Sequence, residues 1–170
     1  LPSDAETVLQ RIRSAASFLM VGTLEPRKGH TQVLEAFERL WSQGAPCQLV
    51  LVGRAGWRVE ALLERLRQHP RRQTQLFWLE SISDEYLEKI YAASTCLIAA
   101  SYDEGFGLPL IEAAQHRLPI IARDIPVFRE VAGEHAFYFD GLEPQDLAGA
   151  IERWLALYAS GQQPRSVHMP

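Results

Sequence analysis

Short apolar runs alternate along the chain with longer stretches in which apolar residues recur every three or four positions. The short runs predict strands at 18–21, 48–52, 75–79, 96–100, 119–122 and 136–139. The longer stretches predict helices at 31–41, 57–68, 84–93, 108–116, 126–131 and 144–158. Strands and helices that alternate through short links are typical of a parallel sheet with helices packed against it.

Several predicted strands are apolar at nearly every position, which is the pattern of strands that are covered on both faces. This pattern is seen at 49–52, 97–100 and 119–122. We therefore predict one α/β domain with a doubly wound, Rossmann-like parallel sheet at 16–160, preceded by a lead-in at 1–15 and followed by a flexible tail at 161–170. In such folds ligands bind beyond the carboxyl ends of the strands, so the loops there are where binding residues are expected.

The composition narrows the class of protein. The 170 residues are 47% hydrophobic and 22% charged, which is typical of a globular domain and excludes disordered and fibrous classes. A net charge of -4 argues against nucleic acid as a partner. No apolar run approaches the roughly 20 residues of a membrane span, and no signal-peptide layout is present, so we expect a cytoplasmic location. Because the chain opens at Leu1, we expect a segment of a longer protein or a processed product.

The loop at 101–107 carries the richest chemistry. Glu104 precedes the turn Gly105-Phe106-Gly107, and Glu112 lies about one turn inside the following helix. Glycines allow positive φ angles and close approach of a ligand, and free N–H groups at a helix start favour a phosphate. An acid on each side of a phosphate-binding turn matches a sugar nucleotide, with Glu104 at the sugar and Glu112 at the ribose. The alternative is a solvated loop with an acid at its helix.

A second candidate loop follows the first predicted strand. Gly22 and Gly29 bracket it, and it carries the adjacent cations Arg27 and Lys28. An arginine can bind two phosphate oxygens at once, and a lysine acts as a point charge. The alternative is a solvated basic pair before a helix. His30, the next residue, could contact the ligand or lie in solvent at the helix start.

The two loops together resemble the retaining GT-B glycosyltransferases of family 4, over about 16–158. The family's first-strand loop matches Gly22 to Gly29, and its acid-x7-acid motif matches Glu104 to Glu112. The first of these loops is most similar to that of bacterial mannosyltransferases of surface-polysaccharide assembly. The resemblance implies that this chain is the donor half of a GT-B fold, and that the acceptor half is not in the chain.

The resemblance also implies a role for each matched residue. Arg27 and Lys28 would neutralise the diphosphate leaving group, Glu104 would bind hydroxyls of the donor sugar, and Glu112 would bind the ribose. The base would lie by Gly53 and the segment 79–82. The remaining donor contacts would come from Gly22, Thr23, Gly105, Phe106, Gly107 and Leu108. Many family members carry an arginine where this chain has Thr23, so one phosphate-side cation is absent.

The predicted function is transfer of a sugar with retention, mannose from GDP-mannose, to a glycan or lipid-linked acceptor in surface-polysaccharide synthesis. Since the chain has no Asp-x-Asp motif, cations of the protein would replace a divalent ion, and we predict no metal and no cofactor. The parent enzyme is expected at the inner face of the plasma membrane. Without an acceptor half, this chain is expected to bind the donor but not to transfer sugar.

Two other functions fit the same architecture. One is a non-catalytic module for nucleotide binding or protein interaction, against which the intact Arg27, Lys28 and Glu104 argue. The other is one half of a nucleotide-sugar epimerase.

Overall fold

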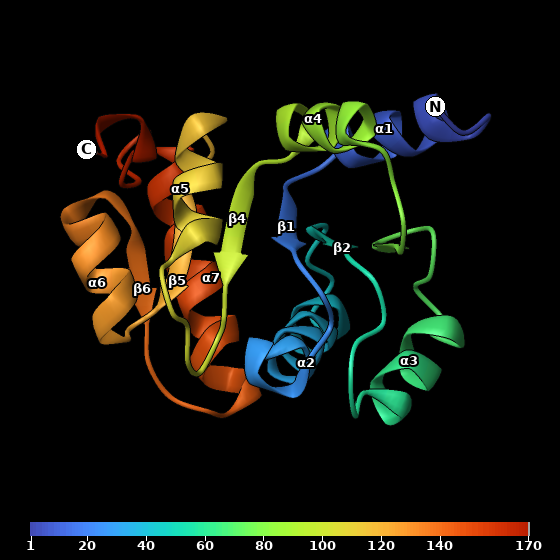
Figure 1. The fold of residues 1–170 in the computed structure, drawn as a ribbon, viewed down its shortest axis with the longest axis horizontal. Helices are drawn as coiled ribbons and strands as arrows, with labels where there is room; N and C mark the ends of the chain where they lie inside the picture. Colours follow the sequence, from blue (N-terminus) through green and yellow to red (C-terminus); the bar gives the residue numbers. More distant parts are fainter. Residues whose placement is uncertain (170) are drawn as a thin grey trace.

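A computed structural model describes residues 1–169, and within them six parallel strands form one sheet in the order β3-β2-β1-β4-β5-β6 (Figure 1). The strands are β1 Ser17–Val21, β2 Gln48–Val52, β3 Leu76–Leu79, β4 Cys96–Ala99, β5 Ile120–Arg123 and β6 Phe137–Phe139. The α-helices are α1 Ala5–Arg13, α2 His30–Ser42, α3 Glu60–Arg67, α4 Asp84–Ala93, α5 Leu108–Gln115, α6 Pro126–Ala132 and α7 Pro144–Ala159. The predicted doubly wound α/β fold is confirmed.

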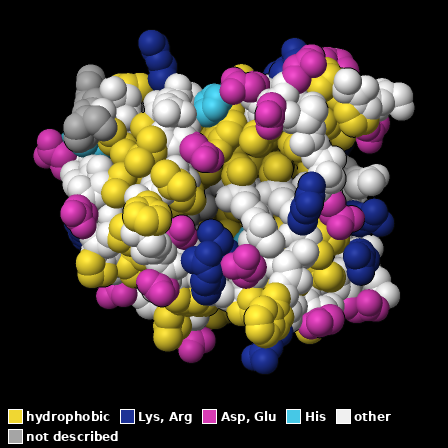
Figure 2. Space-filling model, in the orientation of Figure 1, with side chains coloured by type: hydrophobic (Ala, Val, Ile, Leu, Met, Phe, Trp, Pro, Cys, Tyr) yellow, Lys and Arg dark blue, Asp and Glu magenta, His cyan; other side chains and the backbone are white. Residues whose placement is uncertain are grey.

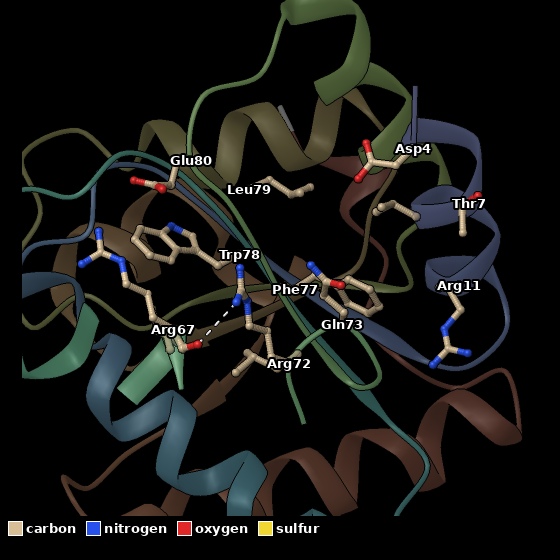
Figure 3. Close-up of a pocket in the computed structure, with 13 residues that line it drawn as sticks. Asp4, Thr7, Arg11, Arg67, Arg72, Gln73, Phe77, Trp78, Leu79 and Glu80 are labelled. Atoms are coloured by element: carbon tan, nitrogen blue, oxygen red, sulfur yellow. Dashed lines mark hydrogen bonds between the residues drawn. The ribbon is translucent and has the colours of Figure 1, made fainter. Parts of the chain in front are cut away.

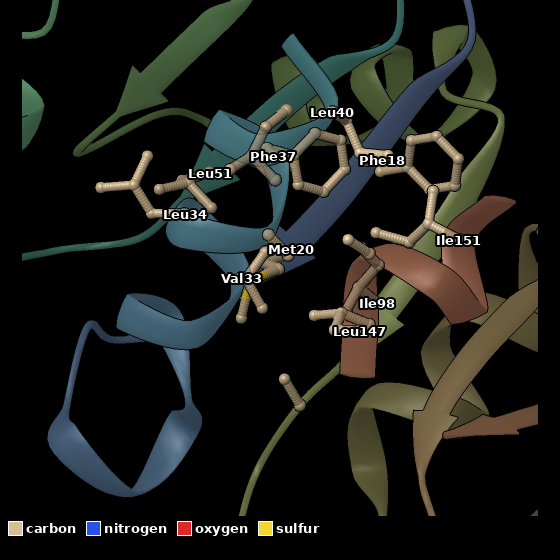
Figure 4. Close-up of a cluster of buried hydrophobic side chains, with 14 of the residues drawn as sticks. Phe18, Met20, Val33, Leu34, Phe37, Leu40, Leu51, Ile98, Leu147 and Ile151 are labelled. Carbon is tan, nitrogen blue, oxygen red and sulfur yellow. The ribbon is translucent and has the colours of Figure 1, made fainter. Parts of the chain in front are cut away.

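Helices cover both faces of the sheet, so two hydrophobic cores form. Successive residues of a strand point to opposite faces, and Phe18 and Met20 of β1 therefore join one core while Leu19 joins the other. The first core lies between the sheet and the helices α2, α3 and α7, and part of it is drawn in Figure 4. The second lies under α1, α4, α5 and α6. Burial on both faces explains why the strands are apolar at nearly every position.

Both ends of the described chain pack onto this fold. Helix α1 lies against α4 (Figure 1) and buries Ala5, Leu9 and Ile12. At the other end, the buried Ser166 donates a hydrogen bond from its hydroxyl to the Leu118 carbonyl oxygen over 2.7 Å. The segments expected as a lead-in and a flexible tail thus both contact the sheet layers up to Met169. None of the helices within 1–169 has the length and apolar character needed to cross a bilayer.

Helix starts follow the local sequence. Ser83 caps α4, where its hydroxyl oxygen accepts the Tyr86 amide hydrogen over 3.1 Å, as its position before two acids predicts. Helix α7 begins with a capping box in which the side chains of Glu143 and Asp146 each accept a backbone amide of the other residue. Capping fixes the residue at which each helix begins, and this in turn sets the length of the loop before it.

Candidate functional site

The site lies at the point where the strand order reverses. Strand β1 pairs with β2 on one side and with β4 on the other, so the connections after β1 and β4 run to opposite sides of the sheet. The crevice that this leaves outside the carboxyl ends of the strands is the usual ligand site of doubly wound folds. The two loops that the sequence marks out, 22–29 and 101–107, are the ones that border it.

The structure brings the predicted catalytic residues together in this crevice. The Lys28 Nζ atom lies 3.4 Å from Glu104 Oε2, and the Arg27 Nη1 atom lies 4.0 Å from the same oxygen. The Ser101 hydroxyl also donates to Glu104 Oε2, over 3.1 Å. A backbone hydrogen bond of 2.9 Å from the Tyr102 amide to the Arg27 carbonyl ties the two loops together. Ser101 is a residue of this cluster that the sequence did not mark out, although its place two residues after the end of β4 was a usable signal.

The two cations differ in their freedom to move. The Lys28 side chain is 17% exposed and Glu104 is 11% exposed, so this ion pair is largely shielded from water. The Arg27 side chain is half exposed, with Nε 3.1 Å from Glu25 Oε2 and Nη1 donating to the Asp103 carbonyl oxygen over 3.3 Å. The Arg27 guanidinium group is therefore held at the surface, whereas the Lys28 ammonium group is largely enclosed beside Glu104.

Glu112 lies on the exposed surface of α5, eight positions after Glu104. Its Oε2 atom is 3.5 Å from the Tyr91 hydroxyl, and the Tyr91 ring stacks on His116 at a centroid distance of 4.0 Å. Burial and the Glu112 carboxylate raise the pKa of Tyr91 well above its usual value. Glu112 thus presents a carboxylate with one neutral hydrogen-bond partner, and the two acids of the motif lie in separate surroundings.

The turn between the two acids leaves its amides unpaired. Pro109 has no amide hydrogen, and Leu110 and Ile111 donate to the Gly107 carbonyl oxygen. Within residues 1–169, the backbone amides of Gly105, Phe106, Gly107 and Leu108 have no hydrogen-bond acceptor. They precede the positive end of the α5 dipole, as a phosphate site requires.

The side chains of this turn are open to the surface. Phe106 is 78% exposed, and hydrophobic side chains gather on the face over α5 (Figure 2). Of the two glycines, only Gly107 has the expected positive φ, 69°; Gly105 lacks it, and its α-carbon faces open space. Gly107 thus uses the conformational freedom of glycine, whereas at Gly105 the absent side chain leaves room beside the backbone.

At Gly53 the loop after β2 lies in close contact with the loop after β1. A Cβ atom on Gly53 would collide with the Gly22 carbonyl oxygen. The Gly22 amide donates to the Val52 carbonyl oxygen over 2.9 Å, and the Trp78 indole donates to the Gly53 carbonyl oxygen over 3.0 Å. Thr23 is exposed beside this contact. The structure thus places Gly22, Thr23 and Gly53 together at the rim of the crevice.

His30 is neither a solvated helix start nor an open ligand contact. The residue is 5% exposed, and burial together with the Lys28 charge lowers the pKa of its imidazole from 6.5 to about 4, although a hydrogen bond to the Glu25 backbone opposes this. Its Nδ1 atom has no hydrogen-bond partner within the described chain. A cavity of about 20 Å³, lined by Lys28, His30 and Ser101, lies beside it and has room for about one water molecule.

The neutral state of His30 predicts a pH dependence of stability. As the pH falls from 6.5 toward 4, the unfolded chain gains a proton at His30 that the folded chain does not, so the free energy of unfolding falls. The loss reaches at most about 3 kcal/mol. Urea denaturation of the His30→Leu variant is expected to show a smaller loss over this window than the unchanged chain. Equal losses in the variant and in the unchanged chain would contradict the assignment.

A larger cavity of about 480 Å³ lies at the free edge of β3, where Figure 3 shows Arg67 and Arg72 near Trp78. Arg27, Lys28 and Glu104 are not among its lining residues. It is therefore a separate feature of the fold.

Comparison with known proteins shows the family of the chain. The profile of the family described as "Glycosyl transferases group 1" matches residues 9–166. The chain is 57% identical over 166 residues to "Serotype-specific mannosyltransferase WbdA" of Escherichia coli, which covers 98% of this chain and 20% of that protein. It is 31% identical over 142 residues to "O-antigen chain mannosyltransferase B" of Escherichia coli, covering 82% of this chain and 37% of that protein.

Solved structures show the same fold. The C-terminal domain of a "Glycosyl Transferase Group 1 Family Protein (LpcC)" from Francisella tularensis superposes with a TM-score of 0.74 at 19% identity, covering 95% of this chain and 87% of that one. Anabaena Alr3699/HepE in complex with UDP and glucose superposes with a TM-score of 0.75 at 22% identity, covering 96% and 45%. The chain spans about a fifth of the length of WbdA. Because the family profile matches nearly the whole length of the chain, the chain belongs to the glycosyl transferases group 1 family.

Proposed function

We propose that this chain is the donor-binding domain of a retaining glycosyltransferase that uses GDP-mannose and acts on a glycan or lipid-linked acceptor in surface-polysaccharide synthesis. The observation that carries the proposal is the meeting of Arg27, Lys28 and Glu104 beside the unpaired amides that precede α5. Mannosyltransferases of Escherichia coli among the relatives support mannose as the sugar. The complex of Anabaena HepE with UDP and glucose supports a nucleotide site on this fold.

The donor would lie across the crevice with its sugar at Glu104 and its ribose at Glu112. The amides of 105–108 and the cations Arg27 and Lys28 would hold the diphosphate, Glu104 would accept hydrogen bonds from sugar hydroxyls, and Glu112 would accept them from the ribose. Lys28 and Glu104 form an ion pair with each other. A donor with a phosphate next to sugar hydroxyls would supply a partner for each, so the pair would open without leaving a buried charge unpaired.

The proposed reaction needs only charges and hydrogen bonds from this domain. The bond between the sugar C1 atom and the diphosphate oxygen breaks, and its electron pair goes to the leaving diphosphate. The acceptor hydroxyl forms a new bond to C1 from the same face, and its proton passes to a phosphate oxygen. Arg27 and Lys28 stabilise the charge that develops on the diphosphate, where a divalent cation would otherwise act.

The rest of the parent enzyme is part of the same proposal. The acceptor would be held by a segment outside this chain, and the reaction would take place in the cytoplasm at the inner face of the membrane. Cys47 and Cys96 are both buried and unpaired, which suits a reducing compartment. Incubation of the 170-residue chain with GDP-mannose and a glycan acceptor is expected to give no transfer product. Steady turnover would contradict this expectation.

Nucleotide binding tests the proposal directly. Calorimetric titration with GDP, UDP and ADP is expected to give the tightest binding for GDP, and GDP-mannose is expected to bind at least as tightly as GDP. Thermal denaturation in the same buffer verifies that the protein is folded. The absence of heat with every nucleotide, in folded protein, would contradict the proposal and favour an interaction module.

The two acids of the motif are expected to respond differently to neutralisation. Glu104→Gln is expected to weaken binding of GDP-mannose by about 10- to 100-fold but not binding of GDP, because charge-assisted hydrogen bonds to sugar hydroxyls are lost. Glu112→Gln is expected to weaken binding of GDP and of GDP-mannose equally, since both ligands carry the ribose. Calorimetric titration of the two variants compares these effects. Equal weakening of GDP and GDP-mannose by Glu104→Gln would contradict the sugar assignment.

A further inference from the structure

A buried arginine lies directly under the two loops of the site. Arg123 is the last residue of β5 and is 4% exposed. Its Nε atom donates to the Ala100 carbonyl oxygen over 3.0 Å, Nη1 donates to the Gly141 carbonyl oxygen over 2.8 Å, and Nη2 donates to the Gln32 side-chain oxygen. One guanidinium group thus connects the end of β4, the loop before α7 and helix α2.

Two aromatic rings complete the surroundings of this cation. The guanidinium carbon of Arg123 lies 4.4 Å from the centroid of the Tyr102 ring and 4.7 Å from that of Phe139. Aromatic faces attract a cation, and more strongly where water is excluded. Burying a charge is costly even where it is hydrogen-bonded, so an apolar residue would serve packing here at least as well. The arrangement therefore indicates a purpose other than filling space.

The residues that Arg123 holds are those from which the site loop departs. Ala100 and Tyr102 flank Ser101, whose hydroxyl donates to Glu104. The Tyr102 amide donates to the Arg27 carbonyl oxygen. A Cβ atom on Gly29 would collide with the same Ala100 carbonyl oxygen that Arg123 binds. The loop 101–107, which carries Glu104, and the loop 22–29, which carries Arg27 and Lys28, thus meet at the short segment to which Arg123 is hydrogen-bonded.

We propose that Arg123 is a positioning residue, which holds the segment 100–102 so that Glu104 and the pair Arg27 and Lys28 face one donor molecule together. The part of this proposal that concerns donor binding rests on the proposed function. The part that concerns the position of the segment 100–102 does not. A lysine cannot reproduce it, because the three hydrogen bonds leave from different nitrogens of one planar group, whose carbon also lies 4.4 Å from the centroid of the Tyr102 ring.

Gln32 provides a matched control. Its side-chain amide donates to the carbonyl oxygens of Gly141 and Glu143 over 3.1 and 2.9 Å, and the residue is 3% exposed. It shares the Gly141 contact with Arg123 but has no hydrogen bond to Ala100. Gln32→Leu thus removes a buried polar group from the same network, and with it the hydrogen bond from Arg123 Nη2, but it leaves the hydrogen bond from Arg123 Nε to Ala100.

Amide hydrogen exchange in the ligand-free chain tests the holding of the segment. In Arg123→Met the Tyr102 amide is expected to exchange about tenfold faster than in Gln32→Leu, which corresponds to about 1.4 kcal/mol of local opening. The Gly53 amide, which donates to the Leu79 carbonyl oxygen, serves as the internal reference. Equal exchange of the Tyr102 amide in both variants overturns the proposal. Should Arg123→Met fail to fold, Arg123→Lys is compared with Gln32→Leu by the same criterion.

Calorimetry with GDP-mannose then tests the consequence for the donor. Arg123→Met is expected to bind about tenfold more weakly than Gln32→Leu at a temperature where thermal denaturation shows both to be folded. Faster exchange at Tyr102 without this loss of affinity overturns the positioning of the site residues. If the unchanged chain binds no GDP-mannose, the proposed function fails, and the exchange comparison still decides whether Arg123 holds the segment.

Discussion

Replacement of Lys28 by methionine is expected to weaken binding of GDP by about 10- to 100-fold, the loss of one charge-assisted hydrogen bond to a phosphate. The Lys28 ammonium group is largely shielded and lies 3.4 Å from Glu104 Oε2, so it is already placed where the diphosphate of a donor would lie. Methionine keeps much of the side-chain volume and removes the charge. Isothermal titration with GDP measures the change.

The chain offers a matched control for this variant. Lys89 is the other lysine of the chain and lies exposed on α4, so Lys89→Met removes one positive charge away from the two loops. It is expected to leave GDP affinity within about twofold of the original, because exposed charges at a distance are screened by salt. Similar losses for both variants would show that Lys28 acts only through the net charge.

Replacement of Gly53 by alanine is expected to lower the free energy of unfolding by about 2–4 kcal/mol, a size that indicates a specific mechanism. A Cβ atom there would overlap the Gly22 carbonyl oxygen, and this neighbour is backbone that cannot rotate away. The two loops would have to separate, which strains the hydrogen bond from the Gly22 amide to Val52 and the one from Trp78 to Gly53. Urea denaturation measures the loss.

Gly44→Ala separates this collision from the effect of backbone conformation. Gly44 also has a positive φ, 83°, but a Cβ atom on it would meet nothing within 4 Å. Alanine there is expected to cost only about 1–2 kcal/mol, the price of the left-handed conformation. A Gly53→Ala variant no less stable than Gly44→Ala would contradict the close approach of the two loops.

The sequence predicted the sheet, its flanking helices and the loops of the site because each depends on local pattern. Apolar runs mark buried strands whatever their neighbours, and the position of Arg27 and Lys28 directly after one strand and of Glu104 after another places them at the same edge of a parallel sheet. Helix α1 was not predicted, although Ala5, Leu9 and Ile12 follow helical spacing, because the segment was assigned to a lead-in.

The sequence did not show which polar residues become buried. In the sequence, His30 is at the start of a predicted helix and Arg123 is at the polar end of a predicted strand. The neighbouring residues of each are the same as would be expected if its side chain lay in solvent. Burial of His30 depends on the packing of the loop 22–29 against β4, and burial of Arg123 depends on the meeting of Ala100, Gln32 and Gly141. Such environments come from residues distant in the sequence.

The sequence by itself thus determined the kind of fold, the edge at which a ligand would bind, and the residue types that face it, because strand and helix periodicity, glycine turns and charge are properties of short segments. Only the tertiary structure decided that Lys28 pairs with Glu104, that His30 is neutral, and that Arg123 holds the segment 100–102. These outcomes depend on distances across the junction of β1 and β4, where segments more than seventy residues apart meet.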